Sequence, residues 1–248
     1  MTDGRKVIKL IAIDMDGTLL NNRNEISEEN RNAIKAAEKQ GIHVVISTGR
    51  TRTTCDDLVK SLSLQSYLIT VNGSEIWDEN GTLVERTLLD TAFIEHMWGL
   101  KQKYNTYCWG ATVGNVWREG IPEDLSAHEW MKFGFDIPDD RIREIIYKEL
   151  SDNEALEVSN SSPTNLEINA KGVNKAKALN KVCQRLGFTM ENVMALGDSL
   201  NDIAMIQGAG LGIAMGNAQE SVKEAANWIT ATNIEDGVAQ AIQKWVLT

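Results

Sequence analysis

Near the N-terminus, seven largely apolar residues give way at once to an acidic, glycine-containing pentapeptide. Residues 7–13 read VIKLIAI, and residues 14–18 read DMDGT. A short apolar run rich in β-branched residues is typical of a buried strand and is too short for a core helix. We therefore predict a buried parallel strand that ends at Asp14.

The sequence on both sides of the middle third alternates strand patterns with helix patterns. The first third predicts helices at 27–40 and 54–62 and strands at 43–47 and 67–71. The last third predicts strands at 193–196, 211–214 and 228–230 and helices at 174–186, 202–207, 221–226 and 238–246. Right-handed crossovers place helices on both faces of such a sheet, so we predict an α/β fold with a doubly wound, Rossmann-like parallel sheet.

The middle third lacks this alternation. Its patterns predict helices at 91–103 and 140–150 and strands at 113–117, 156–159 and 166–169. We predict an α+β insert, residues 83–171, in a core formed by residues 1–82 and 172–248. The insert holds most of the aromatic residues: Phe93, Trp98, Tyr104, Tyr107, Trp109, Trp117, Trp130, Phe133 and Phe135. These aromatic residues are expected to pack the hydrophobic core of the insert. The alternative is that one or two of the rings face a ligand and stack on a sugar or a heterocycle.

The net charge of the chain and its hydropathy pattern limit the kinds of molecule that it is expected to bind. The 25 basic and 35 acidic residues give a net charge of −10, which disfavours binding to nucleic acid or to an anionic membrane. No apolar run approaches the roughly 18 residues of a membrane span, and no secretory signal is recognisable. A cytoplasmic location is expected, and the oligomeric state stays open.

Four polar clusters follow predicted strands or begin a predicted helix. They are residues 14–18, Thr48-Gly49-Arg50, Lys175, and Gly197-Asp198-Ser199-Leu200-Asn201-Asp202. The carboxyl ends of parallel strands share one edge of a sheet, where ligands bind, so these clusters are expected to converge. Packed carboxylates raise one another's pKa unless a cation compensates them, and Asp14, Asp16 and Asp198 together would suit Mg²⁺.

The first cluster offers two carboxylates. Strand alternation places the side chains of Asp14 and Asp16 on the same side, so one can act as a nucleophile while the other transfers a proton. Gly17 allows a sharp turn, and the Thr18 hydroxyl can bind the loop locally. The alternative is a capped turn without catalytic function.

Together, the four motifs resemble those of the haloacid dehalogenase superfamily. The motifs are DxDGT at 14–18, TGR at 48–50, Lys175 at a helix start and GDxxND at 197–202. The large insert is similar to the C2 cap of the Cof-type sugar-phosphatase branch. The similarity covers nearly all of the core and is weak within the insert.

The resemblance implies roles for individual residues. Asp14 would be the nucleophile that forms an aspartyl-phosphate, and Asp16 the acid that protonates the leaving oxygen and then the base that activates water. Thr48 and Lys175 would hold the phosphoryl oxygens. Taken alone, Lys175 could also be one of several solvated helix lysines.

The resemblance also implies a Mg²⁺ site and substrate contacts. The ion would be held by the Asp14 carboxylate, the Asp16 main-chain carbonyl and Asp198, with Asp202 supporting these ligands from behind. The implied substrate contacts are Gly49, Arg50, Asn72 and Asn201.

The sequence thus predicts a Mg²⁺-dependent phosphatase that hydrolyses small phosphorylated metabolites, in particular sugar phosphates. One alternative is a phosphotransferase such as a phosphomutase, in which a second hydroxyl accepts the phosphoryl group. Another is a non-catalytic regulator that binds a phosphorylated metabolite. Dehalogenase activity is disfavoured because that chemistry does not need the second acid, Asp16.

Overall fold

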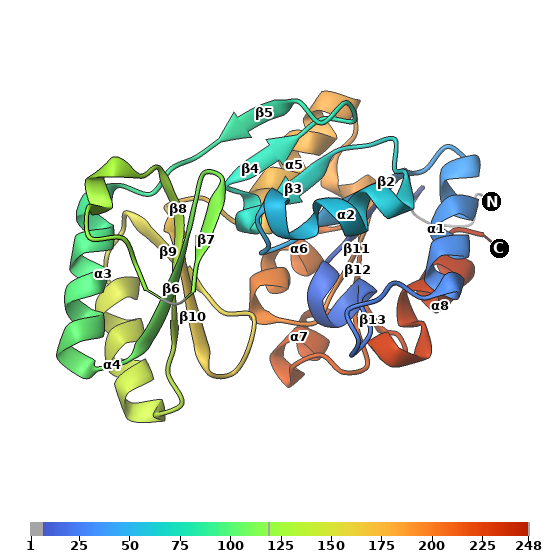
Figure 1. The fold of residues 1–248 in the computed structure, drawn as a ribbon. Helices are drawn as coiled ribbons and strands as arrows, with labels where there is room; N and C mark the ends of the chain where they lie inside the picture. The colour runs from blue at the N-terminus through green and yellow to red at the C-terminus, as the bar shows by residue number, and fades with distance from the viewer. Residues whose placement is uncertain (1–6, 119, 248) are drawn as a thin grey trace.

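The computed structural model describes residues 7–118 and 120–247. It contains an eight-stranded sheet and a separate five-stranded sheet. In Figure 1 the smaller sheet stands at the left of the view, and the larger sheet lies toward the two chain ends at the right. No helix within the described residues combines the length and the apolar character needed to cross a membrane.

The larger sheet has the strand order β13-β12-β11-β1-β2-β3-β4-β5. Its strands are β1 (Leu10–Ile13), β2 (His43–Ser47), β3 (Leu68–Thr70), β4 (Glu75–Trp77), β5 (Leu83–Arg86), β11 (Val193–Gly197), β12 (Leu211–Ala214) and β13 (Trp228–Ile229). The six strands from β13 to β3 are parallel, and β4 and β5 are antiparallel additions at one edge.

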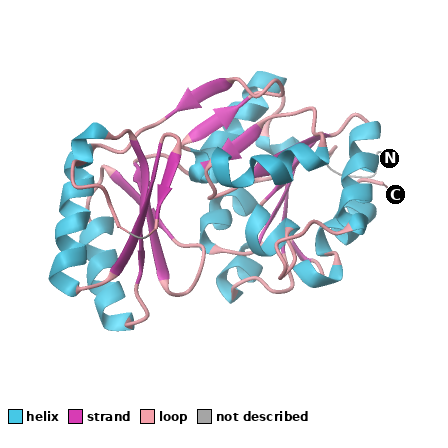
Figure 2. Ribbon diagram, viewed as in Figure 1, coloured by secondary structure: helices cyan, strands magenta, loops and turns pink. Residues whose placement is uncertain are grey.

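Helices cover both faces of this sheet, as Figure 2 shows. They are α1 (Glu28–Lys39), α2 (Arg52–Leu62), α5 (Lys175–Leu186), α6 (Ile203–Gly208), α7 (Glu220–Ala225) and α8 (Gly237–Trp245). Alternate residues of β1 enter different cores: Ile11 and Ile13 pack in the cluster that contains α1 and α8, whereas Leu10 and Ala12 pack in the cluster that contains α5. The predicted doubly wound α/β class is confirmed.

The ends of the first strand differ from the prediction. β1 begins at Leu10 and ends at Ile13, whereas the prediction ran from residue 7 to Asp14. Val7 is 66% exposed, so the apolar run continues beyond the part that the sheet buries. The other predicted core elements are present with ends shifted by up to two residues.

The smaller sheet is antiparallel, with the order β7-β6-β8-β10-β9. Its elements are β6 (Tyr107–Thr112), β7 (Asn115–Trp117), β8 (Trp130–Asp136), β9 (Leu156–Ser159), β10 (Asn165–Ala170), α3 (Thr91–Tyr104) and α4 (Asp140–Ser151). The helices cover the face turned away from the larger sheet (Figure 1). Most aromatic side chains of the insert pack there, including Phe133 and Phe135.

The sequence prediction missed β4, β5, β6 and β8, and it began the strand at 113–117 two residues before β7 begins. Val113 and Gly114 form the turn between β6 and β7, where Gly114 has φ 83°. Glycines and a lysine interrupt the apolar pattern of β6 and β8, so these strands lack a clear period.

The division into domains stays a proposal, with a core at 1–82 and 172–248 and an insert at 83–171. β5 lies within the predicted insert but pairs with β4 of the larger sheet. This pairing favours a first boundary after Arg86.

A bulge in β8 turns the side chains of two consecutive residues, Met131 and Lys132, toward the part of the chain that forms the larger sheet. The register of β6 and β8 shifts between Ala111 and Thr112, which leaves Met131 as an extra residue beside Lys132. Met131 packs with Val71 and Ala111 in a small apolar cluster that joins the two sheets. The Lys132 ammonium donates to the Gly49 carbonyl at 2.7 Å.

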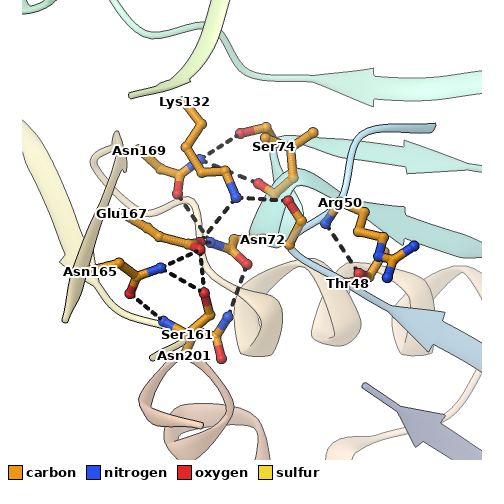
Figure 3. Close-up of polar contacts among 12 residues, drawn as sticks. Thr48, Arg50, Asn72, Ser74, Lys132, Ser161, Asn165, Glu167, Asn169 and Asn201 are labelled. Carbon is orange, nitrogen blue, oxygen red and sulfur yellow. Dashed lines mark hydrogen bonds and ion pairs between the residues drawn. The ribbon is translucent and has the colours of Figure 1, made fainter. Parts of the chain in front are cut away.

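A buried ion pair within the insert lies at this contact with the core, and both of its members bind residues of the core. Lys132 lies 3.0 Å from Glu167, and the Asn72 amide donates to the same carboxylate at 2.6 Å (Figure 3). Burial raises the pKa of Glu167, but Lys132, Ser161 and Asn72 together outweigh burial and lower this pKa overall. The charged form of Glu167 therefore depends on Lys132 and on residues from both sheets.

We predict that Lys132→Met destabilises the protein by about 3 kcal/mol, because it leaves the Glu167 carboxylate buried without its cation. Lys132→Met combined with Glu167→Gln should recover a large part of the loss, since no charge then remains. Urea unfolding followed by circular dichroism measures both variants, with the exposed Lys148→Met as control. Equal unfolding midpoints for Lys132→Met and Lys148→Met would show that the ion pair does not anchor the insert.

Candidate active site

The DMDGT segment leaves the sheet as a tight coil. The Leu19 amide donates to the Asp14 carbonyl at 3.2 Å, and the Leu20 amide donates to the Met15 carbonyl at 2.9 Å. Gly17 has φ 78°, and a Cβ atom there would lie 2.4 Å from a carboxylate oxygen of Asp198. Only glycine fits this position, because the coil must pass directly against the loop after β11.

Asp14 points inward to a lysine that two carboxylates share. The Lys175 ammonium, at the start of α5, lies 2.5 Å from Asp14 and 2.7 Å from Asp202. Burial lowers the pKa of Lys175, but the two carboxylates outweigh burial and raise it overall. Lys175 is 1% exposed, so it is not one of the solvated helix lysines.

Asp198 faces Asp14 across the coil. Its two carboxylate oxygens accept hydrogen bonds from the hydroxyls of Thr18 at 2.9 Å and Ser199 at 3.0 Å. Burial and the nearby Asp202 raise the pKa of Asp198 to about 6. Burial and Asp202 also raise the pKa of Asp14 well above its usual range, against the opposing effect of Lys175.

Asp202 positions the loop that carries Asp198. One of its oxygens accepts hydrogen bonds from the amides of Asp198 and Ser199, both at 3.1 Å, and the other binds Lys175. The side chain is fully buried. Asp202 therefore fixes the geometry of its neighbours.

These carboxylates form a candidate metal centre. One oxygen from each of Asp14, Asp198 and Asp202 lies within 4.8 Å of the others. The predicted convergence of Asp14 and Asp198 is confirmed. Three carboxylates and the single Lys175 ammonium leave two negative charges, which one divalent cation would balance. An all-oxygen donor set also suits Mg²⁺, so the residues present fit this ion.

The Asp16 side chain does not point in the direction that strand alternation predicted. The chain has left the strand before Asp14, so strand alternation does not apply. Instead, Asp16 is half-exposed and accepts hydrogen bonds from the Arg50 guanidinium at 2.5–3.1 Å. Hydrogen bonds to Asp16 raise the pKa of Arg50. Asp14 and Asp16 nevertheless line the same cavity.

The other residues predicted to contact the substrate differ in whether they line this cavity or are buried behind its wall. Gly49, Arg50 and Asn201 line it. Thr48 is fully buried, and its hydroxyl accepts a hydrogen bond from the Arg50 amide at 3.1 Å. Asn72 is 2% exposed and bridges Glu167 and Asn201 (Figure 3). The roles assigned to these residues stay predictions.

The cavity has a volume of about 630 Å³ and lies between core and insert. The insert contributes Trp109, Ala111, Val116, Arg118, Lys132, Ser161, Asn165 and Glu167. Sequence reasoning included Trp109 among the aromatic residues of which one or two were expected, as one alternative, to face a ligand, and it missed the others. Lys132 within the apolar run WMKFGF was the available signal, because a lone charge in a buried strand needs a partner.

Known proteins with similar sequences are haloacid dehalogenase-like hydrolases and phosphatases. The profile of the haloacid dehalogenase-like hydrolases matches residues 11–133 and 118–242. The 5-amino-6-(5-phospho-D-ribitylamino)uracil phosphatase YcsE of Bacillus subtilis (strain 168) is 65% identical over 240 residues, which cover 97% of this chain and 96% of that protein. YitU of the same organism, named for the same activity, is 31% identical and covers 95% of this chain and 97% of its own length.

Solved structures show the same fold. The structure of a haloacid dehalogenase-like hydrolase from B. subtilis superposes with a TM-score of 0.88 at 28% identity, covering 95% of this chain and 99% of that one. The resemblance inferred from the four motifs is thereby confirmed. This chain belongs to the haloacid dehalogenase-like hydrolase family, in its Cof-type branch, and is a phosphatase.

Proposed function

We propose that this phosphatase is Mg²⁺-dependent, that it forms an aspartyl-phosphate on Asp14, and that its substrates are small phosphorylated sugars or sugar alcohols. The observation that carries the proposal is the charge imbalance around Asp14: three carboxylates lie together beside a cavity, and the Lys175 ammonium pairs with two of them, Asp14 and Asp202. Such a cluster suits a divalent cation and a phosphate ester better than it suits a purely structural role.

In the first step, a carboxylate oxygen of Asp14 attacks phosphorus, and the bond from phosphorus to the alcohol oxygen breaks. Asp16 starts as a carboxylate bound to Arg50. A phosphate dianion competes for the same guanidinium, so substrate binding would free Asp16 to take up a proton from solvent. Asp16 then gives this proton to the alcohol oxygen.

In the second step, a water oxygen attacks phosphorus while the Asp16 carboxylate takes a proton from this water. The bond between phosphorus and Asp14 breaks, which releases phosphate and restores Asp14. Lys175 stays bound to Asp14 and Asp202 and limits the repulsion between the nucleophile and the phosphate.

Asp14 and Asp198 would hold Mg²⁺, together with the main-chain carbonyl of Asp16, while Asp202 supports them. When bound, the ion supplies positive charge to the phosphoryl oxygens and to the surrounding carboxylates. The hydrogen bonds from Thr18 and Ser199 keep Asp198 oriented for this task.

The substrate class is proposed from the cavity and from the relatives. YcsE and YitU are named for a phosphate ester of a ribityl chain, which is a sugar alcohol. The cavity of this chain offers polar side chains for such hydroxyls, among them Ser161, Asn165 and Asn201. We propose 5-amino-6-(5-phospho-D-ribitylamino)uracil as the first substrate to test.

Asp14→Asn should abolish hydrolysis of p-nitrophenyl phosphate, lowering kcat on the order of a thousandfold or more, because the amide cannot act as the nucleophile. Circular dichroism should show an unchanged fold. The exposed Asp57→Asn on α2 is the matched control and should keep wild-type activity. Substantial turnover by Asp14→Asn would refute the covalent mechanism.

Asp16→Asn should lower kcat by about 10²–10⁴-fold, the range of general acid–base catalysis. The loss should be smaller for p-nitrophenyl phosphate than for an alkyl phosphate, since nitrophenolate needs less protonation when it leaves. Phosphate release assays with both esters measure the difference. Equal losses for the two esters would argue against Asp16 as the acid in the first step.

Removal of divalent ions with EDTA should abolish activity, and added Mg²⁺ should restore it. In Asp198→Asn the half-saturating Mg²⁺ concentration should rise at least about tenfold, because a ligand loses its charge. Isothermal titration calorimetry with MgCl₂ gives the same comparison without turnover, with the exposed Asp152→Asn as control. An unchanged titration of Asp198→Asn would remove Asp198 from the ligand set.

A further inference from the structure

One aromatic ring of the insert faces the cavity. Among the residues that line it, Trp109 on β6 is the aromatic one. Other tryptophans of the insert are committed elsewhere: the Trp130 indole donates to the Leu125 carbonyl at 2.8 Å, and the Trp117 indole donates to the Thr112 hydroxyl at 3.1 Å. Within residues 7–118 and 120–247, the Trp109 indole N–H has no such partner.

Trp109 rests on a glycine that provides room for it. Trp109 lies opposite Gly134 in the register of β6 and β8. A Cβ atom at Gly134 would come within 2.2–2.7 Å of three atoms of the indole ring. The ring therefore lies across the bare backbone of β8, which holds it in place and limits the entropy that it would lose on binding a ligand.

Trp109 has apolar neighbours in the wall of the cavity. Ala111 and Val116 lie opposite each other on β6 and β7 and line the cavity beside Trp109. Asp14, Asp16 and Arg50 line it from the core. Trp109, Ala111 and Val116 thus form an apolar surface on the insert side of the cavity, apart from the charged residues of the core.

We infer that Trp109 is a specificity-determining residue that stacks on a flat aromatic ring in the alcohol part of the substrate. The inference rests on the proposed function, because the phosphate must lie at Asp14. The acyclic chain of a sugar alcohol has no flat apolar face, whereas an aromatic ring presents apolar faces that match Trp109, Ala111 and Val116. The Lys132 ammonium, 4.9 Å from the Trp109 ring centre, adds positive charge beside this platform.

The test uses two phosphate esters with the same polyol. One is 5-amino-6-(5-phospho-D-ribitylamino)uracil, which carries a ring, and the other is D-ribitol 5-phosphate, which does not. Trp109→Ala should lower kcat/KM for the first ester by about tenfold, mainly through KM, and should change the second by less than about twofold. Trp109→Phe should retain most of the activity on the first ester, because a phenyl ring can also stack.

Trp98→Ala is the control, since Trp98 lies on α3 of the same insert and does not line the cavity. It should leave the ratio of the two kcat/KM values unchanged. Equal losses for both esters in Trp109→Ala, or no loss for either, would overturn the inference and leave the proposed phosphatase mechanism standing.

A binding measurement separates the inference from the proposed function. Calorimetric titration with the dephosphorylated product, ribitylaminouracil, needs no turnover and should show about tenfold weaker binding to Trp109→Ala than to the wild type. If the wild type hydrolysed neither ester but this difference persisted, the proposed substrate would be wrong and the stacking role would stand. Equal product binding by the wild type and Trp109→Ala would overturn the stacking role.

Discussion

Repulsion between buried carboxylates is the constraint around which this molecule is organised. Asp14, Asp198 and Asp202 each bring one oxygen within 4.8 Å of the others, and the Lys175 ammonium pairs with Asp14 and Asp202. Burial and mutual repulsion raise the pKa values of Asp14 and Asp198. Such a cluster is costly to assemble unless a cation completes it, so its presence at the edge of a sheet points to chemistry on an anionic substrate.

The fold assembles this cluster from distant parts of the chain. β1 and β11 are paired neighbours, so the residues that follow them meet at one edge of the sheet. The insert then covers this edge through β8, whose bulge turns Met131 and Lys132 toward the core. Lys132 binds the carbonyl of Gly49 and its partner Glu167 binds Asn72, so the contacts that join the insert to the core also enclose the cavity.

The core and its acidic cluster were predictable, because strand periodicity and parallel topology fix where a strand-terminal residue such as Asp14 or Asp198 must lie. The direction of Asp16 was not, since it depends on the coil after β1 and on its long-range pairing with Arg50. β6 and β8 were missed because Gly110, Gly134 and Lys132 interrupt their apolar pattern. Tertiary contacts, which a local sequence pattern cannot reveal, explain why these residues stand in the strands. The two glycines make room for tryptophan rings, and the lysine forms an ion pair with Glu167.

The most direct test of this account is to locate a divalent cation. Crystals grown with Mn²⁺ in place of Mg²⁺ would give an anomalous scattering peak at the ion. The account predicts one strong peak in contact with carboxylate oxygens of both Asp14 and Asp198, beside the undisturbed Lys175–Asp202 pair. A saturated crystal with its Mn²⁺ peak elsewhere, and none between Asp14 and Asp198, would contradict it.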